Sequence, residues 1–351
     1  MTPLNTPQPD LCRRAVRAVG ASLVLTSAVG AISWGFVPHK RLHAKAWSLL
    51  PPDLQRAWHT GPAPLVLRAT DADSRKHTDS LEAARHYLDV DDIEAEGLNV
   101  WGQPWRDAQP VLVSDSLGQS ARRFGVLPWQ LEWSYRRLVA AWSPTDSTMP
   151  NPEAISRAAA DLGHYLADAH VPLHTSGNYD GQRTGQRGIH ALWETHALEW
   201  MLSPSQRRSC PPCQLLEWTY DPVWTPWETL QESHAMAADV LNAELEWRAL
   251  CAAQGHGFRR RGRTMTLLPT QEALALWDSL TYGHTWPRYC RAAERIAAAW
   301  HSAWVDAGRP HLPRTPKRPW QERLALYLPP QWRAFLLPHS HDTTSLAPMD
   351  P

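Results

Sequence analysis

Residues 151–194 have the sequence NPEAISRAAADLGHYLADAHVPLHTSGNYDGQRTGQRGIHALWE, which predicts two helices joined by a polar loop. The first helix has a capping residue at Asn151, a proline in its first turn and apolar residues at helical spacing. His164 and Asp168 lie four positions apart, so their side chains project from one face of this helix. A proline then ends the helix near His170. This helix therefore presents an imidazole and a carboxylate together.

The second helix, which we expect to begin near Gly188, repeats this arrangement with His190 and Glu194. His174 follows the exit of the first helix. One histidine four residues from an acid usually forms only a surface pair. Two such pairs with a histidine between them indicate a polynuclear metal site inside a helical bundle, and nitrogen and carboxylate ligands suit zinc.

The composition is that of a globular protein. The chain has 351 residues, of which 43% are hydrophobic, enough for one large domain or two ordinary ones. Its formal net charge is zero, so global electrostatics neither demand nor exclude a nucleic-acid partner. We expect most of the twenty tryptophans to lie in the core. Because strand signals are sparse, we expect an all-α fold, a multi-helix bundle with the metal site in a cleft.

The apolar spacing predicts further helices along the chain. We expect a loop at 69–78 that is followed by a short helix, and longer helices towards the C-terminus; the predicted helical ranges are 80–87, 128–142, 228–253, 271–282 and 286–307. Several acids near the short helix are interpreted as a solvated face or as caps: Asp79, Glu82, Asp89, Asp91 and Asp92. In the loop between the two ligand-bearing helices, Asn178 and Tyr179 could touch a substrate. The simpler interpretation is that both are ordinary loop residues.

Residues 1–33 resemble a secretory signal peptide. A positive segment with three arginines precedes an apolar run of about fourteen residues, shorter than the roughly 20 that span a bilayer. A small-x-small cleavage site ends at Ser33. We therefore expect a periplasmic or secreted protein with a helical domain at 34–308 and a Pro-rich, partly mobile extension at 309–351. Removal of the signal, which carries a net charge of +2, leaves the mature chain near −2.

Four cysteines remain after the signal is removed: Cys210, Cys213, Cys251 and Cys290. An even number in an exported protein permits disulfides, here in three possible pairings.

The segments HYLADAHVPLH and GIHALWE resemble the central motifs of the zinc-dependent phospholipase C and single-strand nuclease superfamily. That family has the pattern His-x3-Asp-x5-His, followed after a loop by His-x3-Asp or His-x3-Glu. The resemblance covers roughly residues 34–200 and implies a trinuclear zinc site. It also implies that the mature chain begins with a tryptophan, whose free amine and carbonyl oxygen bind one zinc. Cleavage after Ser33 gives such a chain, beginning at Trp34.

The resemblance further implies a distribution of ligands. His39 follows Trp34 at the spacing of the nuclease branch, and Asp71 precedes His86 by fifteen residues, as in the family's first zinc site; Asp73 is the competitor for that position. His43 is interpreted as structural. The implied ligands are Asp71, His86, His164 and Asp168 for one zinc, His174, His190 and Glu194 for a second, and Trp34 and His39 for a third that shares Asp168.

Such a site suits phosphoester hydrolysis. Two metals about 3.5 to 4 Å apart can hold a hydroxide and neutralise the charge that grows on phosphoryl oxygens. Asp71 is the candidate general base. Glu194 is typical of the phospholipase branch and the Trp34-to-His39 spacing of the nuclease branch, so the substrate is either a phospholipid or single-stranded nucleic acid. A non-catalytic protein stabilised by zinc is the alternative class. We infer no stable protein partner and allow peripheral contact with a membrane.

Overall fold

The computed structural model describes residues 36–112, 123–143, 150–212, 220–254, 258–261, 264–281 and 283–312. The chain divides into two units at Ser33, and all described residues belong to the second unit, Trp34–Pro351. The expected signal segment, the expected terminal ligand Trp34 and residues 313–351 of the expected extension lie outside the described residues.

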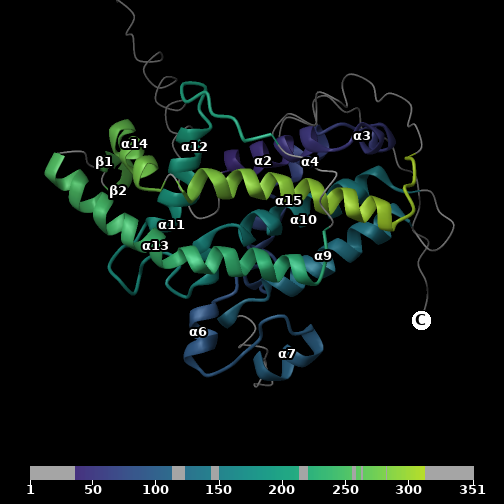
Figure 1. The fold of residues 1–351 in the computed structure, drawn as a ribbon, viewed down its shortest axis with the longest axis horizontal. Coiled ribbons are helices and arrows are strands. Elements are labelled where there is room, and N and C mark those ends of the chain that lie inside the picture. The colour runs from purple at the N-terminus through teal and green to yellow at the C-terminus, as the bar shows by residue number, and fades with distance from the viewer. Residues whose placement is uncertain are drawn as a thin grey trace, which may run out of the picture. The chain divides into compact units, whose positions relative to one another are not determined.

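Helices dominate the described structure, which confirms the expected all-α class (Figure 1). The described residues also contain one antiparallel hairpin, formed by β1 and β2, which the sequence did not predict. In chain order the elements are α2 (Phe36–Leu49), α3 (Pro52–Trp58), α4 (Ala63–Arg68), α5 (Asp71–Arg75), the 3-10 helix η1 (Ala83–His86), α6 (Val90–Ala95), α7 (Trp105–Leu112), α9 (Leu127–Trp142), α10 (Pro152–Ala169), the 3-10 helix η2 (Pro172–Thr175), α11 (Ile189–Ala191), the π-helix η3 (Leu192–Ala197), α12 (Leu198–Met201), α13 (Trp224–Gln254), β1 (Phe258–Arg261), β2 (Thr264–Pro269), α14 (Gln271–Leu280) and α15 (Thr285–Asp306).

Helix α10 is the central helix of the bundle and packs against α2, α4, α9 and α15 (Figure 1). It begins as predicted, because the Asn151 side chain accepts hydrogen bonds from the backbone N–H groups of Glu153 and Ala154. Almost all its residues from Ile155 to Ala169 are buried. The helix that carries His164 and Asp168 is therefore enclosed on most sides.

Small residues let neighbouring helices approach α10 closely. A Cβ atom at Gly163 would lie 2.6 Å from Nε2 of His43, so only glycine allows α2 to pack here. The Trp300 indole of α15 donates a hydrogen bond of 2.9 Å to the carbonyl oxygen of Ala159. The small residues of the α10 sequence thus determine how near α2 and α15 lie to the helix that carries His164 and Asp168.

Most of the described tryptophans are buried in the core, although Trp224 is exposed. The ring of Trp58 meets Trp142 and Trp300 edge-on, with centroids 5.2 and 5.8 Å apart. Edge-to-face contacts of this kind add to the stabilisation that burial provides. Seven tryptophans have less than 2% of their surface exposed: Trp58, Trp129, Trp142, Trp193, Trp247, Trp277 and Trp300.

The four long predicted helices outside residues 151–194 agree with α9, α13, α14 and α15 to within a few residues. The prediction for 69–87 was wrong in detail. The expected loop contains the helix α5, and the expected helix is a turn followed by η1. The Asp79 carboxylate accepts a hydrogen bond of 2.9 Å from the backbone N–H of Leu81, which favours a turn over a helix at that point.

Cys210, after α12, forms a disulfide with Cys290 of α15, and Cys251 is a buried free thiol. Cys213 lies outside the described residues. Among the described helices, none has both the length and the apolar character required to cross a membrane.

Candidate metal centre

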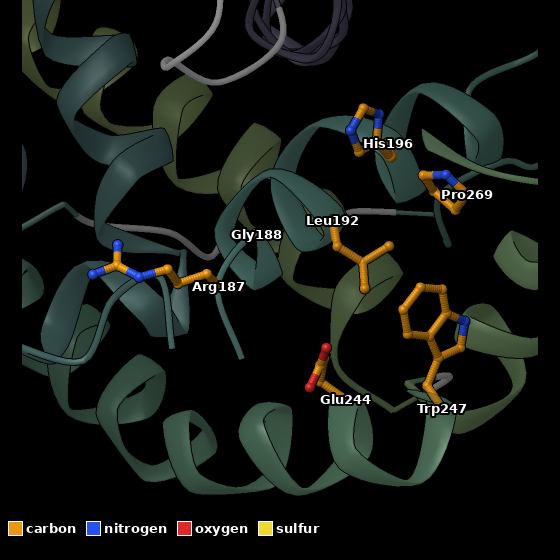
Figure 2. A pocket seen from close by; sticks show the side chains of 7 residues that line it. All are labelled: Arg187, Gly188, Leu192, His196, Glu244, Trp247 and Pro269. Atoms are coloured by element: carbon orange, nitrogen blue, oxygen red, sulfur yellow. The ribbon is translucent and has the colours of Figure 1, made fainter. Parts of the chain in front are cut away.

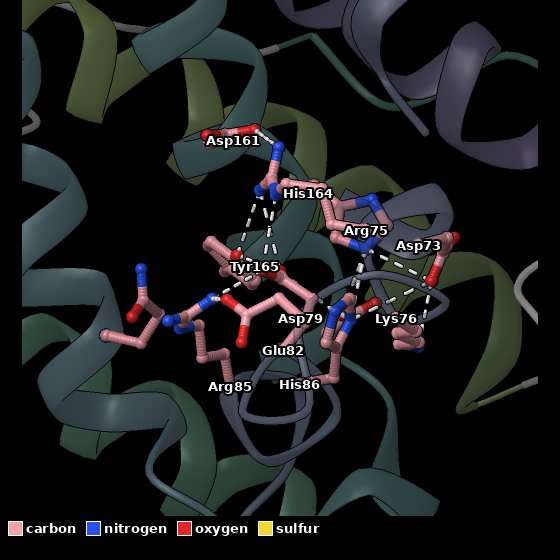
Figure 3. Close-up of polar contacts among 12 residues, drawn as sticks. Asp73, Arg75, Lys76, Asp79, Glu82, Arg85, His86, Asp161, His164 and Tyr165 are labelled. Atoms are coloured by element: carbon pink, nitrogen blue, oxygen red, sulfur yellow. Dashed lines mark hydrogen bonds and ion pairs between the residues drawn. The ribbon is translucent and has the colours of Figure 1, made fainter. Parts of the chain in front are cut away.

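His164 and Asp168 of α10 belong to the first donor group, where they meet side chains from α5 and η1. Figure 3 shows His164 of this group with Asp73 and His86. His164 Nε2 lies 3.2 Å from His86 Nδ1 and 3.6 Å from Asp73 Oδ1. Asp168 Oδ2 lies 2.7 Å from His86 Nδ1 and 3.4 Å from His164 Nε2. Four donor atoms from three separate elements therefore converge on one buried point.

The acid in this group is Asp73, and the expectation for Asp71 was wrong. The Asp71 side chain is 40% exposed and accepts a hydrogen bond of 2.9 Å from Arg68. The Asp73 side chain is 7% exposed and lies near Lys76 as well as the histidines. The two acids are two positions apart on the five-residue helix α5, about 200° around its axis, so they cannot face the same side.

The second carboxylate oxygen of Asp168 faces His39. His39 Nε2 lies 3.6 Å from Asp168 Oδ1, and the His39 ring stacks on His164 with centroids 4.1 Å apart. Asp168 thus presents one oxygen to His39 and the other to His86 and His164, the arrangement expected of a carboxylate shared between two ions. His43 lies outside this set, because its ring nitrogens approach the carbonyl oxygens of His39 and Ala160.

His174, His190 and Glu194 form a separate donor group. Glu194 Oε2 lies 2.9 Å from His190 Nε2 and 3.4 Å from His174 Nε2, although neither pair has the geometry of a hydrogen bond. Glu194 lies in the π-helix η3, and helical turns of this rare type are frequent at functional sites. The His190 side chain is 20% exposed, the most of any donor in the two groups. Solvent therefore reaches the centre on the His190 side.

Backbone carbonyl groups orient three of the histidine rings. Nδ1 of His164 lies 2.8 Å from the carbonyl oxygen of Ala69, Nδ1 of His174 lies 2.5 Å from that of His86, and Nδ1 of His190 lies 3.2 Å from that of Tyr179. A histidine that donates one N–H to a carbonyl leaves its other nitrogen as a lone-pair donor, the usual arrangement of metal ligands. In all three residues the remaining nitrogen is the one that faces the donor group.

Burial keeps the histidines of the first group in their neutral form. It holds the pKa of His86 well below the usual value, and it also lowers the pKa of His164. Burial, with repulsion from His164, likewise lowers the pKa of His39. Neutral imidazole is the form that binds a metal ion, so these side chains need not lose a proton first.

Burial opposes the ionisation of both acids in the first donor group. Burial and the neighbouring Asp73 raise the pKa of Asp168 well above the usual value. Burial opposes the ionisation of Asp73 too, but His164 and Lys76 hold the pKa of this carboxyl low. A bound divalent cation would stabilise both carboxylates in their ionised form.

Zinc fits the spacing of these donors. Tetrahedral zinc with ligands at about 2.0–2.2 Å places its donor atoms roughly 3.3 Å apart. The donor atoms of the two groups lie 2.7 to 3.9 Å from their neighbours. They lie within 4.8 Å of one another in three sets, which are Asp73 with His86 and His164, His39 with His164 and Asp168, and His174 with His190 and Glu194. Four buried atoms of the residues in these groups have no hydrogen-bond partner among the described residues, namely Asp73 Oδ2, His86 Nε2, His174 Nε2 and Glu194 Oε2. The donor chemistry, spacing and burial all suit a metal ion.

The acids interpreted as surface residues include one that the structure buries completely. The Glu82 side chain is 0% exposed and accepts hydrogen bonds from Arg75, Arg85 and Tyr165 (Figure 3). Burial opposes its ionisation, but the neighbouring His86 and hydrogen bonds from Tyr165 and Arg75 hold the pKa of Glu82 below the usual value. Glu82 lies four residues before His86, and this spacing was the only feature of the sequence that could have indicated a role beside that histidine.

Two further acids hold the loop between η2 and α11. Asp91 accepts hydrogen bonds from the Ser176 hydroxyl and the Gly177 backbone N–H, at 2.7 and 2.8 Å. Arg183 donates two hydrogen bonds to Asp92. A Cβ atom at Gly177 would lie 2.3 Å from both the Asp92 carboxylate and the Arg183 guanidinium, so a larger residue here would displace this ion pair. Asp91 and Asp92 were interpreted as a solvated face or as caps; they lie in the first turn of α6, and they also hold this loop.

The same loop places Tyr179 at the exposed edge of the centre. Its side chain is half exposed, and its ring meets His190 edge-on with centroids 5.8 Å apart. Asn178 is buried instead, where its side chain binds Thr184 and the backbone of Arg183 within the loop. Of the two loop residues considered as substrate contacts, only Tyr179 is available to a ligand.

A small cavity behind η3 contains none of these donors. Figure 2 shows its lining, which consists of Arg187, Gly188, Leu192, His196, Glu244, Trp247 and Pro269. Its one buried acid, Glu244, is already bound by Gln186 and Arg248. We therefore assign the functional site to the two donor groups.

Comparisons of the chain with protein-family models, with curated proteins and with solved structures give no match. The function is therefore argued from the donor groups themselves.

Proposed function

We propose that residues 34–308 form an exported zinc-dependent hydrolase of phosphodiesters, similar to phospholipase C. The observation that carries this proposal is the convergence of histidines and carboxylates from six elements, all buried except the partly exposed His190, with three ring nitrogens oriented by backbone carbonyls. A structural zinc site is usually closed and rich in thiolates. These donors are nitrogen and oxygen atoms, and one group supplies only three.

The ions would be held in three positions. The first takes Asp73, His86, His164 and Asp168, and the second takes His174, His190 and Glu194. The third takes His39 and the other oxygen of Asp168, with the amine and carbonyl of Trp34 if the chain is processed after Ser33. Three protein ligands at the second position leave coordination room for a substrate.

Zinc bound in this way supplies Lewis acidity towards phosphoryl oxygens and an activated nucleophile at neutral pH. The chain's own residues contribute orientation and proton transfer. Asp73 directs Oδ1 to the first donor group, while its Oδ2 has no hydrogen-bond partner among the described residues. This oxygen replaces Asp71 as the candidate general base.

The substrate enters on the side of His190 and Tyr179, where the centre is most exposed. A mature chain with a net charge near −2 has little global attraction for a polynucleotide. Glu194 at the last ligand position is typical of the phospholipase branch. We therefore infer that a phospholipid or another small phosphodiester is cleaved faster than single-stranded nucleic acid.

One observation favours the nuclease alternative. The exposed Tyr179 ring beside His190 is suited to stacking on a nucleobase, and such stacking contributes about 1–3 kcal/mol per base. The two substrates are distinguished by initial rates at equal phosphoester concentration and fixed salt. Faster zinc-dependent cleavage of single-stranded DNA or RNA would select the nuclease.

The test uses protein expressed with its own first 33 residues, so that the amino terminus is processed naturally. Zinc content and hydrolysis of phosphatidylcholine, single-stranded nucleic acid and a simple phosphate diester are measured together. Asp168→Asn and Glu194→Gln should both lose zinc and activity, whereas the control His301→Ala should retain them. Zinc binding without turnover on any phosphoester would leave a non-catalytic, zinc-stabilised protein.

A further inference from the structure

Glu82 lies directly behind His86, on the side away from the donor group (Figure 3). His86 directs Nδ1 at Asp168, His164 and Asp73, so its Nε2 points outward. Nε2 is 3.4 Å from Glu82 Oε1, a contact without the geometry of a hydrogen bond, and it has no hydrogen-bond partner among the described residues. Glu82 is therefore the carboxylate within reach of the outward nitrogen.

This arrangement differs from that of the other oriented rings. His164, His174 and His190 each have a backbone carbonyl behind the ring. Only His86 has a carboxylate in that place among these four. A carboxylate behind a metal-binding histidine fixes the tautomer and the ring orientation, and its loss typically lowers metal affinity 10- to 100-fold.

Glu82 is itself held firmly. Arg75 Nε donates to its Oε2 at 3.2 Å, Arg85 donates to the same oxygen at 2.5 Å, and the Tyr165 hydroxyl donates to Oε1. Arg75 also binds Asp161 on α10, at 3.0 Å. Since Tyr165 and Asp161 both lie on the helix that carries His164, these bonds connect η1 to α10.

We propose that Glu82 is a positioning residue that holds the His86 ring with Nδ1 directed into the first donor group. The inference rests on the metal centre of the proposed function, but it does not depend on the reaction that the centre catalyses. Glu82 does not touch the ion or the substrate; it acts through His86.

The test compares Glu82→Gln with Asp161→Asn. Both variants remove one carboxylate from the same buried network, but only Glu82 approaches His86. Zinc affinity is measured by competition with a chromophoric chelator, and thermal unfolding of the metal-free protein reports the structural cost. We expect Glu82→Gln to weaken one bound ion 10- to 100-fold, and Asp161→Asn to change affinity less than about threefold at a similar loss of stability.

A purely structural role predicts equal weakening in the two variants, and that result would overturn the proposal, as would wild-type affinity in Glu82→Gln. If Glu82→Gln does not fold, Tyr165→Phe takes its place, because it removes one donor to Glu82 and keeps the carboxylate. We then expect a loss of about threefold or more, and unchanged affinity would count against the proposal.

Zinc binding and hydrolysis by the wild-type protein distinguish a failure of this inference from a failure of the proposed function. If the wild-type protein binds zinc but hydrolyses no phosphoester, the proposed enzymatic function is wrong, but the zinc affinities of the variants can still be compared. A wild-type protein that binds no zinc contradicts both.

Discussion

Replacing Asp73 or Asp71 by asparagine separates two acids that the sequence alone does not distinguish. Asn is isosteric with Asp, so each change removes a charge and little else. The Asp73 carboxylate is 7% exposed and lies within 3.9 Å of two histidines of the first donor group. Loss of one partner from a buried set of charges costs about 3–5 kcal/mol. At about 1.4 kcal/mol per tenfold, zinc affinity should fall roughly a hundred- to several-thousand-fold.

Asp71 provides the matched control. Its side chain is 40% exposed, and its partner is the partly exposed Arg68. Pairs of this kind contribute about 0–1 kcal/mol, so Asp71→Asn should change zinc affinity by less than about fivefold. Affinity is measured by chelator competition and turnover on a simple phosphodiester. A strong loss in Asp71→Asn with near-normal affinity in Asp73→Asn would refute the placement of α5.

Three further predictions concern stability and substrate binding. Burial and the nearby Asp92 raise the pKa of Asp89 to about 8, so this carboxyl stays neutral in the folded protein up to that pH. In the unfolded chain it ionises near its ordinary pKa of about 4, so the free energy of unfolding falls by about 1.4 kcal/mol per pH unit as the pH rises from 4 to 8. Asp89→Asn should therefore raise the unfolding midpoint at pH 8 and leave it unchanged at pH 4; an equal effect at both would count against the shift. The Cys210–Cys290 disulfide closes a loop of 80 residues, so Cys210→Ser should lower the free energy of unfolding in urea by up to about 4 kcal/mol, and an unchanged midpoint would be unexpected. Tyr179→Ala should raise KM several-fold at unchanged zinc content, whereas an unaltered KM would remove Tyr179 from the substrate path.

Local sequence patterns predicted the central part of the site well. The i,i+4 pairs at His164 with Asp168 and at His190 with Glu194 require only that each segment be helical, and the cap at Asn151 indicated where the first helix begins. Both pairs lie in helical segments, and each belongs to a buried donor group.

The parts that sequence could not resolve depend on tertiary contacts. Whether Asp71 or Asp73 faces α10 depends on the rotation of a five-residue helix, and spacing along the chain does not encode that rotation. Glu82 resembles any acid in a polar segment until Arg75 and Tyr165, 7 residues before it and 83 after it, surround its carboxylate. Burial of an acid is determined by partners of this kind, which local patterns do not reveal.

The most direct test of the account is to locate zinc in crystals of the naturally processed protein by anomalous diffraction at the zinc edge. We predict one peak at about 2.0–2.2 Å from donor atoms of Asp73, His86, His164 and Asp168, and another at the same distance from those of His174, His190 and Glu194. Zinc-containing crystals without a peak at either group would contradict the central claim.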